Sequence, residues 1–348
     1  MAVDAAGKRA TASSVDAADA ADGMKARMVH RGTAPFIATV VVVFAYCGLH
    51  VADVFQNVRR LRATVPGFPV FARLWPSVPI ALAMVGVRLF MVRTLRPLGR
   101  AALPATKWEP EEYAKRVDRV LHVLFKLCYF VIATPVGWYI LKDEPWMPPS
   151  MGGTGDVIHC WTNFPHHAMP DAIHWYYVVS LGYHLHSLLY QLGSTRRNDF
   201  WEMFLHHSCT LFLVVFSYMA NLFRFGTLVF WLHDCGDISS YWVKAFVDTR
   251  YTNITILAYL GIMSTWGYLR LYVFPFEIIR CAIFDAPFHI PGVPMLCTLM
   301  CVLTCLHLYW YTLFIRMGVA FLHTGKTEDV IEDVATDSEL VARKRVPC

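Results

Sequence analysis

The chain has 348 residues, of which 56% are hydrophobic and only 16% are charged, and its net charge is +5. Soluble globular domains carry about 25% charged residues, so this composition excludes an ordinary soluble domain and places the chain in a bilayer. The basic residues are scattered between long apolar runs and form no single stripe, which argues against nucleic-acid binding.

Apolar runs define the predicted elements in chain order. Residues 1–34 contain no apolar run that could act as a signal peptide, and we predict a disordered tail. A membrane-crossing helix needs about 20 apolar residues. Seven stretches meet this requirement: Phe36–Phe55, Val120–Leu141, Ala172–Leu192, Met203–Ala220, Phe225–Phe246, Ile254–Phe274 and Met295–His323. Pro76–Val92 is shorter and contains Arg88, so we predict an all-α polytopic membrane protein with seven or eight transmembrane helices.

Basic residues predict the orientation of these helices, because cytosolic loops carry an excess of Lys and Arg. The segment 93–119 holds seven of them, whereas the long loop after Leu141 offers Lys142 alone and should be lumenal. Alternation then places Arg196 and Arg197 in the cytosol, residues 280–294 in the lumen and the acidic and basic C-terminal tail, 326–348, in the cytosol. The side of the N-terminus stays open, because both flanks of the first helix are basic.

Most of the ten cysteines lie within apolar stretches and are expected to be small buried apolar residues. Cys160 and Cys281 fall in two loops on the same predicted side, so a disulfide between them is compatible with the topology. The sequence contains no CxxC pair and no zinc-ligand spacing.

Ionisable side chains at membrane depth cost at least about 2.5 kcal/mol each, so they require pairing, a wet cavity or a function. Two consecutive predicted helices concentrate them. The first carries His206, His207, Thr210, Ser217 and Asn221, and the second carries His233, Asp234, Asp237 and Tyr241. Spacings of three, four and seven place most of these residues along one face of each helix, which predicts an enclosed polar cavity. At about 1.5 Å per residue, His206 and Asp237 lie roughly 9 and 15 Å inside the cytosolic surface.

Imidazole and carboxylate groups suit metal binding or acid–base and nucleophilic chemistry. The HxxxH and HxxHH boxes of di-iron membrane oxygenases are absent, although a single metal on His206, Asp234 and Asp237 stays an alternative. We therefore predict metal-free transfer chemistry without a cofactor, with His206, His207, Asp234 and Asp237 as catalytic residues. His233, Thr210, Ser217, Asn221 and Tyr241 would support the cavity.

Four segments carry a family resemblance: Arg197-Asn-Asp-Phe-Trp-Glu-Met-Phe-Leu-His-His-Ser-Cys-Thr210, Phe216-Ser-Tyr-Met-Ala-Asn221, Gly226-Thr-Leu-Val229 and Leu232-His-Asp-Cys-Gly-Asp237. This block resembles the longevity-assurance motif of ceramide synthases, and it is far more specific than a short pattern. The likeness indicates a TLC domain over residues 115–325. Residues 35–114 then hold the first transmembrane helix, the second short helix and basic loops, and they lack the homeobox-like segment of many animal members.

The resemblance implies a six-helix barrel in the endoplasmic reticulum membrane that acylates a sphingoid base with acyl-CoA to form ceramide or dihydroceramide. His206 and His207 match the family's essential histidines, and Asp234 and Asp237 match its acidic pair. His206 would attack the thioester, or only deprotonate the amine, with a carboxylate orienting the ring and His207 as base or proton shuttle. The expected partners are acyl-CoA, the sphingoid base and membrane lipids, without nucleic acid, and a homo- or hetero-dimer is compatible with the family.

Two alternatives remain at this point. A TLC-domain lipid sensor or transporter would bind lipid in the same cavity without transforming it. Another N- or O-acyltransferase would use the same residues on a different nucleophile. Acyl length and the preferred sphingoid base are not readable from the sequence.

Overall fold

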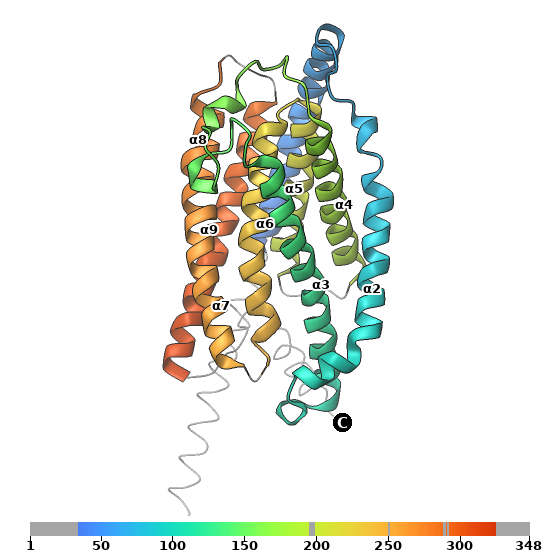
Figure 1. The fold of residues 1–348 in the computed structure, drawn as a ribbon, viewed down its shortest axis with the longest axis vertical. Helices are drawn as coiled ribbons and strands as arrows, with labels where there is room; N and C mark the ends of the chain where they lie inside the picture. The colour runs from blue at the N-terminus through green and yellow to red at the C-terminus, as the bar shows by residue number, and fades with distance from the viewer. Residues whose placement is uncertain (1–33, 195–198, 250, 288–289, 291, 325–348) are drawn as a thin grey trace, which may run out of the picture.

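The computed structural model describes residues 34–194, 199–249, 251–287, 290 and 292–324 (Figure 1). The predicted tails at 1–33 and 326–348 and the basic loop at Arg196 and Arg197 lie outside these residues. The described chain is helical, with long helices running side by side, and it contains no strand in these ranges. The predicted all-α class is therefore confirmed.

Each predicted transmembrane stretch lies largely within a helix, and Pro76–Val92 coincides with the first part of one. The N-terminal helix spans Ala34–Thr64. The following elements are α2 (Ser77–Ala102), α3 (Pro110–Leu141), α4 (Asp171–Gly193), α5 (Phe200–Met219), α6 (Phe223–Phe246), α7 (Thr252–Thr265), the π-helix η5 (Trp266–Ile279), α8 (Arg280–Phe284) and α9 (Val293–Thr324). Short 3-10 turns occur at Phe71–Leu74, Ala105–Lys107, Pro149–Met151 and Val157–Cys160.

Five of the described helices are long and apolar enough to cross a membrane, which confirms a polytopic membrane protein. They are Ala34–Thr64, Phe71–Ala102, Pro110–Leu141, Phe200–Met219 and Val293–His323. The helices α4 and α6 are not among them, because polar and ionisable residues lower their hydropathy. The count of seven or eight spans stays a prediction.

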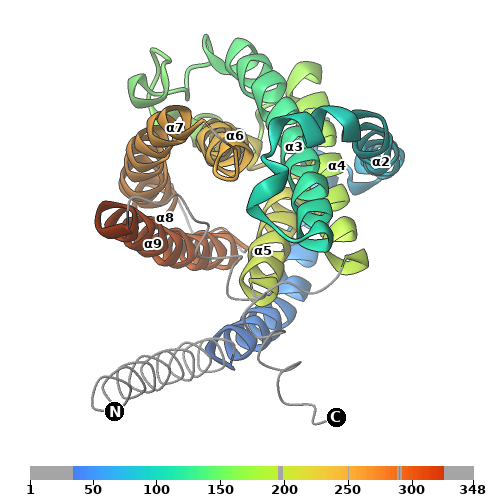
Figure 2. The same cartoon turned by 90° about the horizontal axis from the view of Figure 1, so that it is seen from below.

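The helices pack in a closed series (Figure 2). Helix α3 packs on α6, α6 on α7 and η5, η5 on α9, α9 on α5, and α5 on α4, which returns to α3 and α6. Helix α2 lies outside this series against α3 and α4. The N-terminal helix lies against α5 and α9, where Phe44 contacts Phe212 and Phe36 contacts Tyr309.

The segment 142–170 covers one end of the helices, which we call the capped end; the opposite end, with Phe200 and Phe246, is the open end (Figure 1). The side chain of Asn221 donates to the carbonyls of Pro165 (2.9 Å) and His167 (3.1 Å), and the His167 ring bonds the Asn221 carbonyl (2.9 Å). These bonds fasten the cap to the turn between α5 and α6. Asn221 has φ of 58°, a left-handed conformation that asparagine tolerates better than most residues.

The two cysteines of the predicted loops come together at this capped end. The indole nitrogen of Trp161, next to Cys160, donates to the carbonyl of Cys281 at 3.2 Å. Both thiols are buried and both are free in this structure.

The prediction places the start of the loop 280–294 before the helical structure ends. Helical structure continues from Thr252 through η5 and α8 to Phe284, ten residues past the predicted end at Phe274. The prediction stopped directly before Pro275, which cannot donate a backbone hydrogen bond. The wider turns of the π-helix contain this proline without ending the element.

Acidification should loosen the cap through His167. Burial, with the positive charge of Arg224 as the second cause, lowers the pKa of His167 to about 4. A histidine in the unfolded chain titrates near 6.5, so between pH 6.5 and pH 4 the unfolded state binds more protons than the folded state. The contribution of neutral His167 to the free energy of unfolding is therefore complete above about pH 6.5 and is lost as the pH falls toward 4. We expect His167 to account for about 2 kcal/mol of lost stability between pH 7 and pH 5.

Thermal unfolding of the detergent-solubilised protein at the two pH values measures this effect. His167→Gln keeps a donor for the Asn221 carbonyl but does not titrate, so it should reduce the pH dependence. His159→Gln, at an exposed histidine of the same segment, is the control. An equal pH dependence in the wild type and His167→Gln would contradict the assignment.

Candidate active site

Helix α5 supplies the two neighbouring histidines, whose side chains diverge because successive helical residues are rotated by about 100°. The ring of His206 contacts the indole of Trp310 on α9, with centroids 5.4 Å apart. His207 is 8% exposed, and its ring centroid lies 5.5 Å from that of His206.

Helix α6 supplies the carboxylates, and each has a partner on another helix. Asp234 is 3% exposed and accepts a hydrogen bond from the hydroxyl of Tyr176 on α4 at 3.4 Å. Asp237 accepts a short hydrogen bond from the guanidinium of Arg270 on η5. The same guanidinium nitrogen donates to the backbone carbonyl of His233 at 2.9 Å, so Arg270 binds α6 at two points.

Arg270 was missed by the sequence prediction. It is 3% exposed and lies 4.0 Å from the ring centroid of Trp266, one turn earlier on the π-helix. A Cβ at Gly236 would lie 3.0 Å from its Nε, so the glycine between Asp234 and Asp237 leaves space for the guanidinium. The sequence could have identified Arg270 as a site residue, because an arginine inside the apolar stretch Ile254–Phe274 is as costly in a membrane as a histidine or an aspartate.

His307 of α9 joins the cluster and is fully buried. Its ring centroid lies 5.0 Å from that of His233, 5.6 Å from Trp266 and 5.8 Å from Phe274. His307 lies within the predicted transmembrane stretch Met295–His323, and the sequence does not show which residues of other helices it meets. The structure places it beside the residues that Arg270 binds.

Six buried nitrogen atoms of these histidines and of Arg270 have no hydrogen-bond partner among the described residues. They are Nδ1 of His206, Nδ1 of His207, Nε2 of His233, both ring nitrogens of His307 and Nε of Arg270. Buried polar groups in proteins are normally paired. A group of such atoms at one place therefore has the capacity to bind a polar ligand, which is typical of an active site.

Several residues that were predicted to support the cavity lie away from the polar cluster or bond other groups. Thr210 donates to the carbonyl of His206 on its own helix (2.8 Å), and Tyr241 stacks on Phe130 on the open-end side of Asp237. Ser217 bonds Tyr177 (3.1 Å), and Ser217 and Asn221 both lie toward the capped end. Eleven residues of helix separate Ser217 from His206, about 16 Å along the axis.

No carboxylate orients the two histidines in the described part of the chain. Asp237 bonds Arg270 and Asp234 bonds Tyr176, while Nδ1 of His206 and of His207 has no partner. In these same residues, no group of three or more His, Cys, Asp or Glu side chains is arranged to hold a metal ion.

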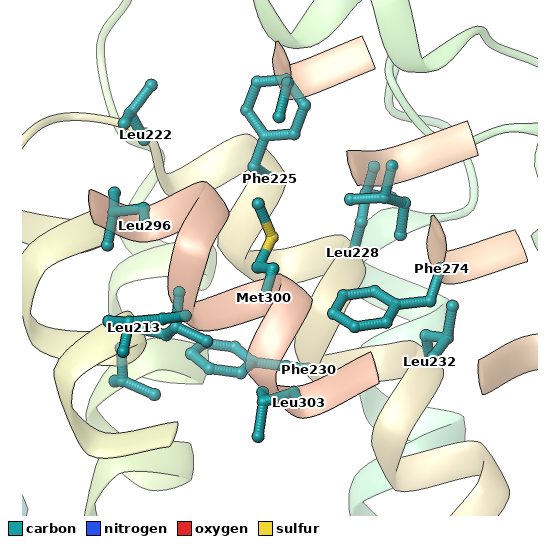
Figure 3. Packing of buried hydrophobic residues seen from close by; sticks show 14 of the residues in the cluster. Leu213, Leu222, Phe225, Leu228, Phe230, Leu232, Phe274, Leu296, Met300 and Leu303 are labelled. Carbon is teal, nitrogen blue, oxygen red and sulfur yellow. The ribbon is translucent and has the colours of Figure 1, made fainter. Parts of the chain in front are cut away.

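An apolar pocket lies on the capped-end side of the polar cluster, and Figure 3 shows several of its lining side chains among the packed apolar residues. The cavity volume between these walls is about 40 Å³. Its walls include Leu213 of α5, Phe225 and Phe230 of α6, and Leu296 and Met300 of α9. Such walls suit a hydrocarbon chain.

Comparison with known families gives a match to the TLC domain over residues 120–316, a range that contains every residue of the polar cluster. The chain belongs to the TLC-domain family. The family match thus coincides with the closed series α3 to α9, while the N-terminal helix and α2 lie outside it.

Individual relatives of this TLC-domain protein are named ceramide synthases. The chain is 28% identical to ceramide synthase hyl-2 of Caenorhabditis elegans over 306 residues, which cover 82% of this chain and 90% of the relative. It is 30% identical to ceramide synthase hyl-1 of the same organism over 63% of this chain and 61% of the relative. It is 33% identical to ceramide synthase 4 of Mus musculus over 61% of this chain and 52% of the relative. The last two alignments span less than two thirds of those relatives.

The ion pair between Arg270 and Asp237 should be essential for stability. Arg270→Gln leaves the carboxylate of Asp237, which is 23% exposed, without its cation. Breaking a fully buried pair costs about 3–5 kcal/mol, so we expect a loss near the lower end of this range, about 3 kcal/mol. The double variant Arg270→Gln with Asp237→Asn removes both charges and should recover part of this loss. Thermal unfolding of the wild type, the single variants Arg270→Gln and Asp237→Asn, and the double variant in one detergent gives the coupling energy.

Arg280→Gln is the matched control, because Arg280 of α8 is 59% exposed and its 3.5 Å contact with Asp285 is a surface ion pair. Equal stabilities of Arg270→Gln and Arg280→Gln would overturn the assignment.

Proposed function

We propose that this protein is a ceramide synthase, which transfers a fatty acyl group from acyl-CoA to the amine of a sphingoid base. The observation that carries the proposal is the group of unpartnered histidine and arginine nitrogens next to an apolar pocket. The polar group can act on a thioester and an amine, and the pocket can receive a hydrocarbon chain. The relatives named ceramide synthases support the same reaction.

A ring nitrogen of His206 attacks the thioester carbonyl, and the carbon–sulfur bond breaks to release CoA as a thiolate. The amine of the sphingoid base then attacks the acyl-imidazole, the amide bond forms and the imidazole leaves, with the amine proton passing to His207. The Nε–H of Arg270 has no acceptor among the described residues, so it can donate to the oxyanion of each tetrahedral intermediate. Asp237 holds this guanidinium in place.

The direct alternative has His206 only remove the proton of the amine. Intact-mass measurement after incubation with acyl-CoA alone separates the two mechanisms. The covalent mechanism predicts one added acyl group in the wild type and none in His206→Ala. Absence of an adduct in the wild type under acidic trapping would leave only direct transfer.

The proposed reaction is tested with purified protein, acyl-CoA and sphinganine. We expect CoA release together with dihydroceramide, and a loss of at least about a hundredfold in His206→Ala, because the reacting group is removed. Folding of the variant is checked by its thermal unfolding. No CoA release with any chain length would favour a lipid sensor or transporter, and a different product mass would identify another acyltransferase.

The proposed reaction also predicts how the helices are oriented in the membrane. The capped end faces the lumen of the endoplasmic reticulum, and the open end and the C-terminus face the cytosol. The depth of the site supports this, since the nucleotide of acyl-CoA must stay in water while the acyl chain enters the helices.

The apolar pocket would hold the acyl chain and limit its length. Cys297 is 7% exposed and lines the pocket, so Cys297→Phe should shorten it. We expect the kcat/KM of the longest accepted acyl-CoA to fall about tenfold or more, with a smaller effect on shorter chains. Cys301→Phe, one turn later on an exposed face of the same helix, is the control. A uniform loss over all chain lengths in Cys297→Phe would contradict this role.

A further inference from the structure

Asp234 is a buried carboxylate that has no role in the reaction steps at His206. Its side chain is 3% exposed, and its one side-chain hydrogen bond among the described residues comes from the hydroxyl of Tyr176 at 3.4 Å. This distance is long for an O–H donor. Asp237, three residues later, has Arg270 as its cation, whereas no described lysine, arginine or histidine forms an ion pair with Asp234. A carboxylate inside a membrane protein needs such a partner, so Asp234 has the capacity to bind a cation.

Helical spacing places Asp234 between the apolar pocket and the guanidinium of the site. Phe230, which lines the pocket (Figure 3), precedes Asp234 by one turn, about 6 Å nearer the capped end. The ring of Phe230 contacts that of Tyr176, with centroids 6.0 Å apart. Asp237 follows on the same face of α6 at a Cβ distance of about 5–6 Å and holds Arg270. A cation at Asp234 therefore lies one turn from the group assigned to the oxyanion.

The Tyr176 hydroxyl that holds this carboxylate is itself confined. A Cβ at Gly137 of α3 would lie 2.8 Å from the hydroxyl and 3.1 Å from the ring of Trp231 on α6, so the glycine leaves the space that the hydroxyl occupies. Tyr176 binds Oδ2 of Asp234, and no described residue donates to Oδ1. One carboxylate oxygen is thus positioned by the protein, and the other remains for a ligand.

The acceptor substrate of the proposed reaction brings a cation. A primary alkylamine titrates near 10.4, as the lysine side chain does, so a sphingoid base carries an ammonium group at neutral pH. This group has no lone pair with which to attack a carbonyl. Two of its three protons must leave during amide formation, and His207 accepts only one of them. A second acceptor is required, and a carboxylate with an open oxygen has the chemistry for it.

We propose that Asp234 binds the ammonium group of the sphingoid base and accepts its first proton. This inference rests on the proposed function and adds the subsite of the acceptor. The N–H bond breaks, the proton passes to Oδ1 of Asp234, and the electron pair stays on the nitrogen. The free amine then attacks the acyl carbon, and the second proton passes to His207 as the amide forms. Tyr176 is a positioning residue that keeps the carboxylate in place.

The test replaces the carboxylate by its neutral amide and compares two nucleophiles. Asp234→Asn can still accept the hydrogen bond of Tyr176 but can neither pair with an ammonium group nor take its proton. We expect acyl transfer to sphinganine to fall about a hundredfold. Transfer to hydroxylamine, which is uncharged at neutral pH, should stay within about twofold of the wild type, because it needs no prior loss of a proton. The acyl adduct formed with acyl-CoA alone should also be unchanged.

Asp171→Asn is the matched control, because this aspartate of α4 has an 89% exposed side chain and lies at the capped end. It should leave transfer to both nucleophiles unchanged. An equal loss with sphinganine and hydroxylamine in Asp234→Asn would overturn the inference, since the carboxylate would then act on the acyl donor or the fold. Absence of amide formation by the wild type would instead refute the proposed function.

A measurement on the wild type covers an Asp234→Asn variant that fails to fold. A long-chain dimethylamine is cationic at neutral pH and cannot form an amide, and the alcohol with the same chain is neutral. The amine should inhibit competitively with sphinganine at about a tenfold lower concentration than the alcohol, the gain of one charged hydrogen bond. Equal inhibition by the amine and the alcohol would overturn the inference.

Discussion

The ion pair between the buried Arg270 and the partly buried Asp237 is the interaction on which the rest of the site depends. A guanidinium and a carboxylate at membrane depth are stable only together, because each alone would carry the full cost of a charge in an apolar surrounding. The pair joins α6 to the π-helix η5, where Trp266 covers the guanidinium and Gly236 leaves it space. A π-helical turn in place of an α-turn is a strained choice that often accompanies function.

The interior has two zones along the helix axis. The histidines and their unpartnered nitrogens lie in the middle, and the apolar pocket lies toward the capped end. This order matches the chemistry of an acyl thioester, in which an apolar chain leads to a reactive carbonyl. An arrangement of this kind orients the donor before any reaction occurs.

Much of the fold and of the candidate site could be predicted from the sequence, and the features that the prediction missed have physical reasons. Apolar length identified the helices, and the cost of ionisable groups in a membrane identified α5 and α6 as the site helices. Helical spacing gives the face of a residue but not its partner, so Ser217 and Asn221 were grouped with His206 although they serve the capped end. Partners on distant helices, such as Arg270 and His307, require the packing of the chain. The π-helix was missed because its apolar residues look the same as those of an α-helix.

The partners of the carboxylates change the mechanism that the sequence suggested. A carboxylate bonded to a histidine fixes its tautomer and stabilises the imidazolium, as in a catalytic triad. Here Asp237 is bonded to Arg270, so its charge positions a hydrogen-bond donor instead of an imidazole. The ring contacts of His206 are with Trp310 and His207, and no carboxylate among the described residues binds its Nδ1, so its nitrogen lone pair is available to a thioester carbonyl. The negative charge that develops on the carbonyl oxygen then meets a guanidinium already fixed in place, which is the condition under which electrostatic stabilisation requires no reorganisation.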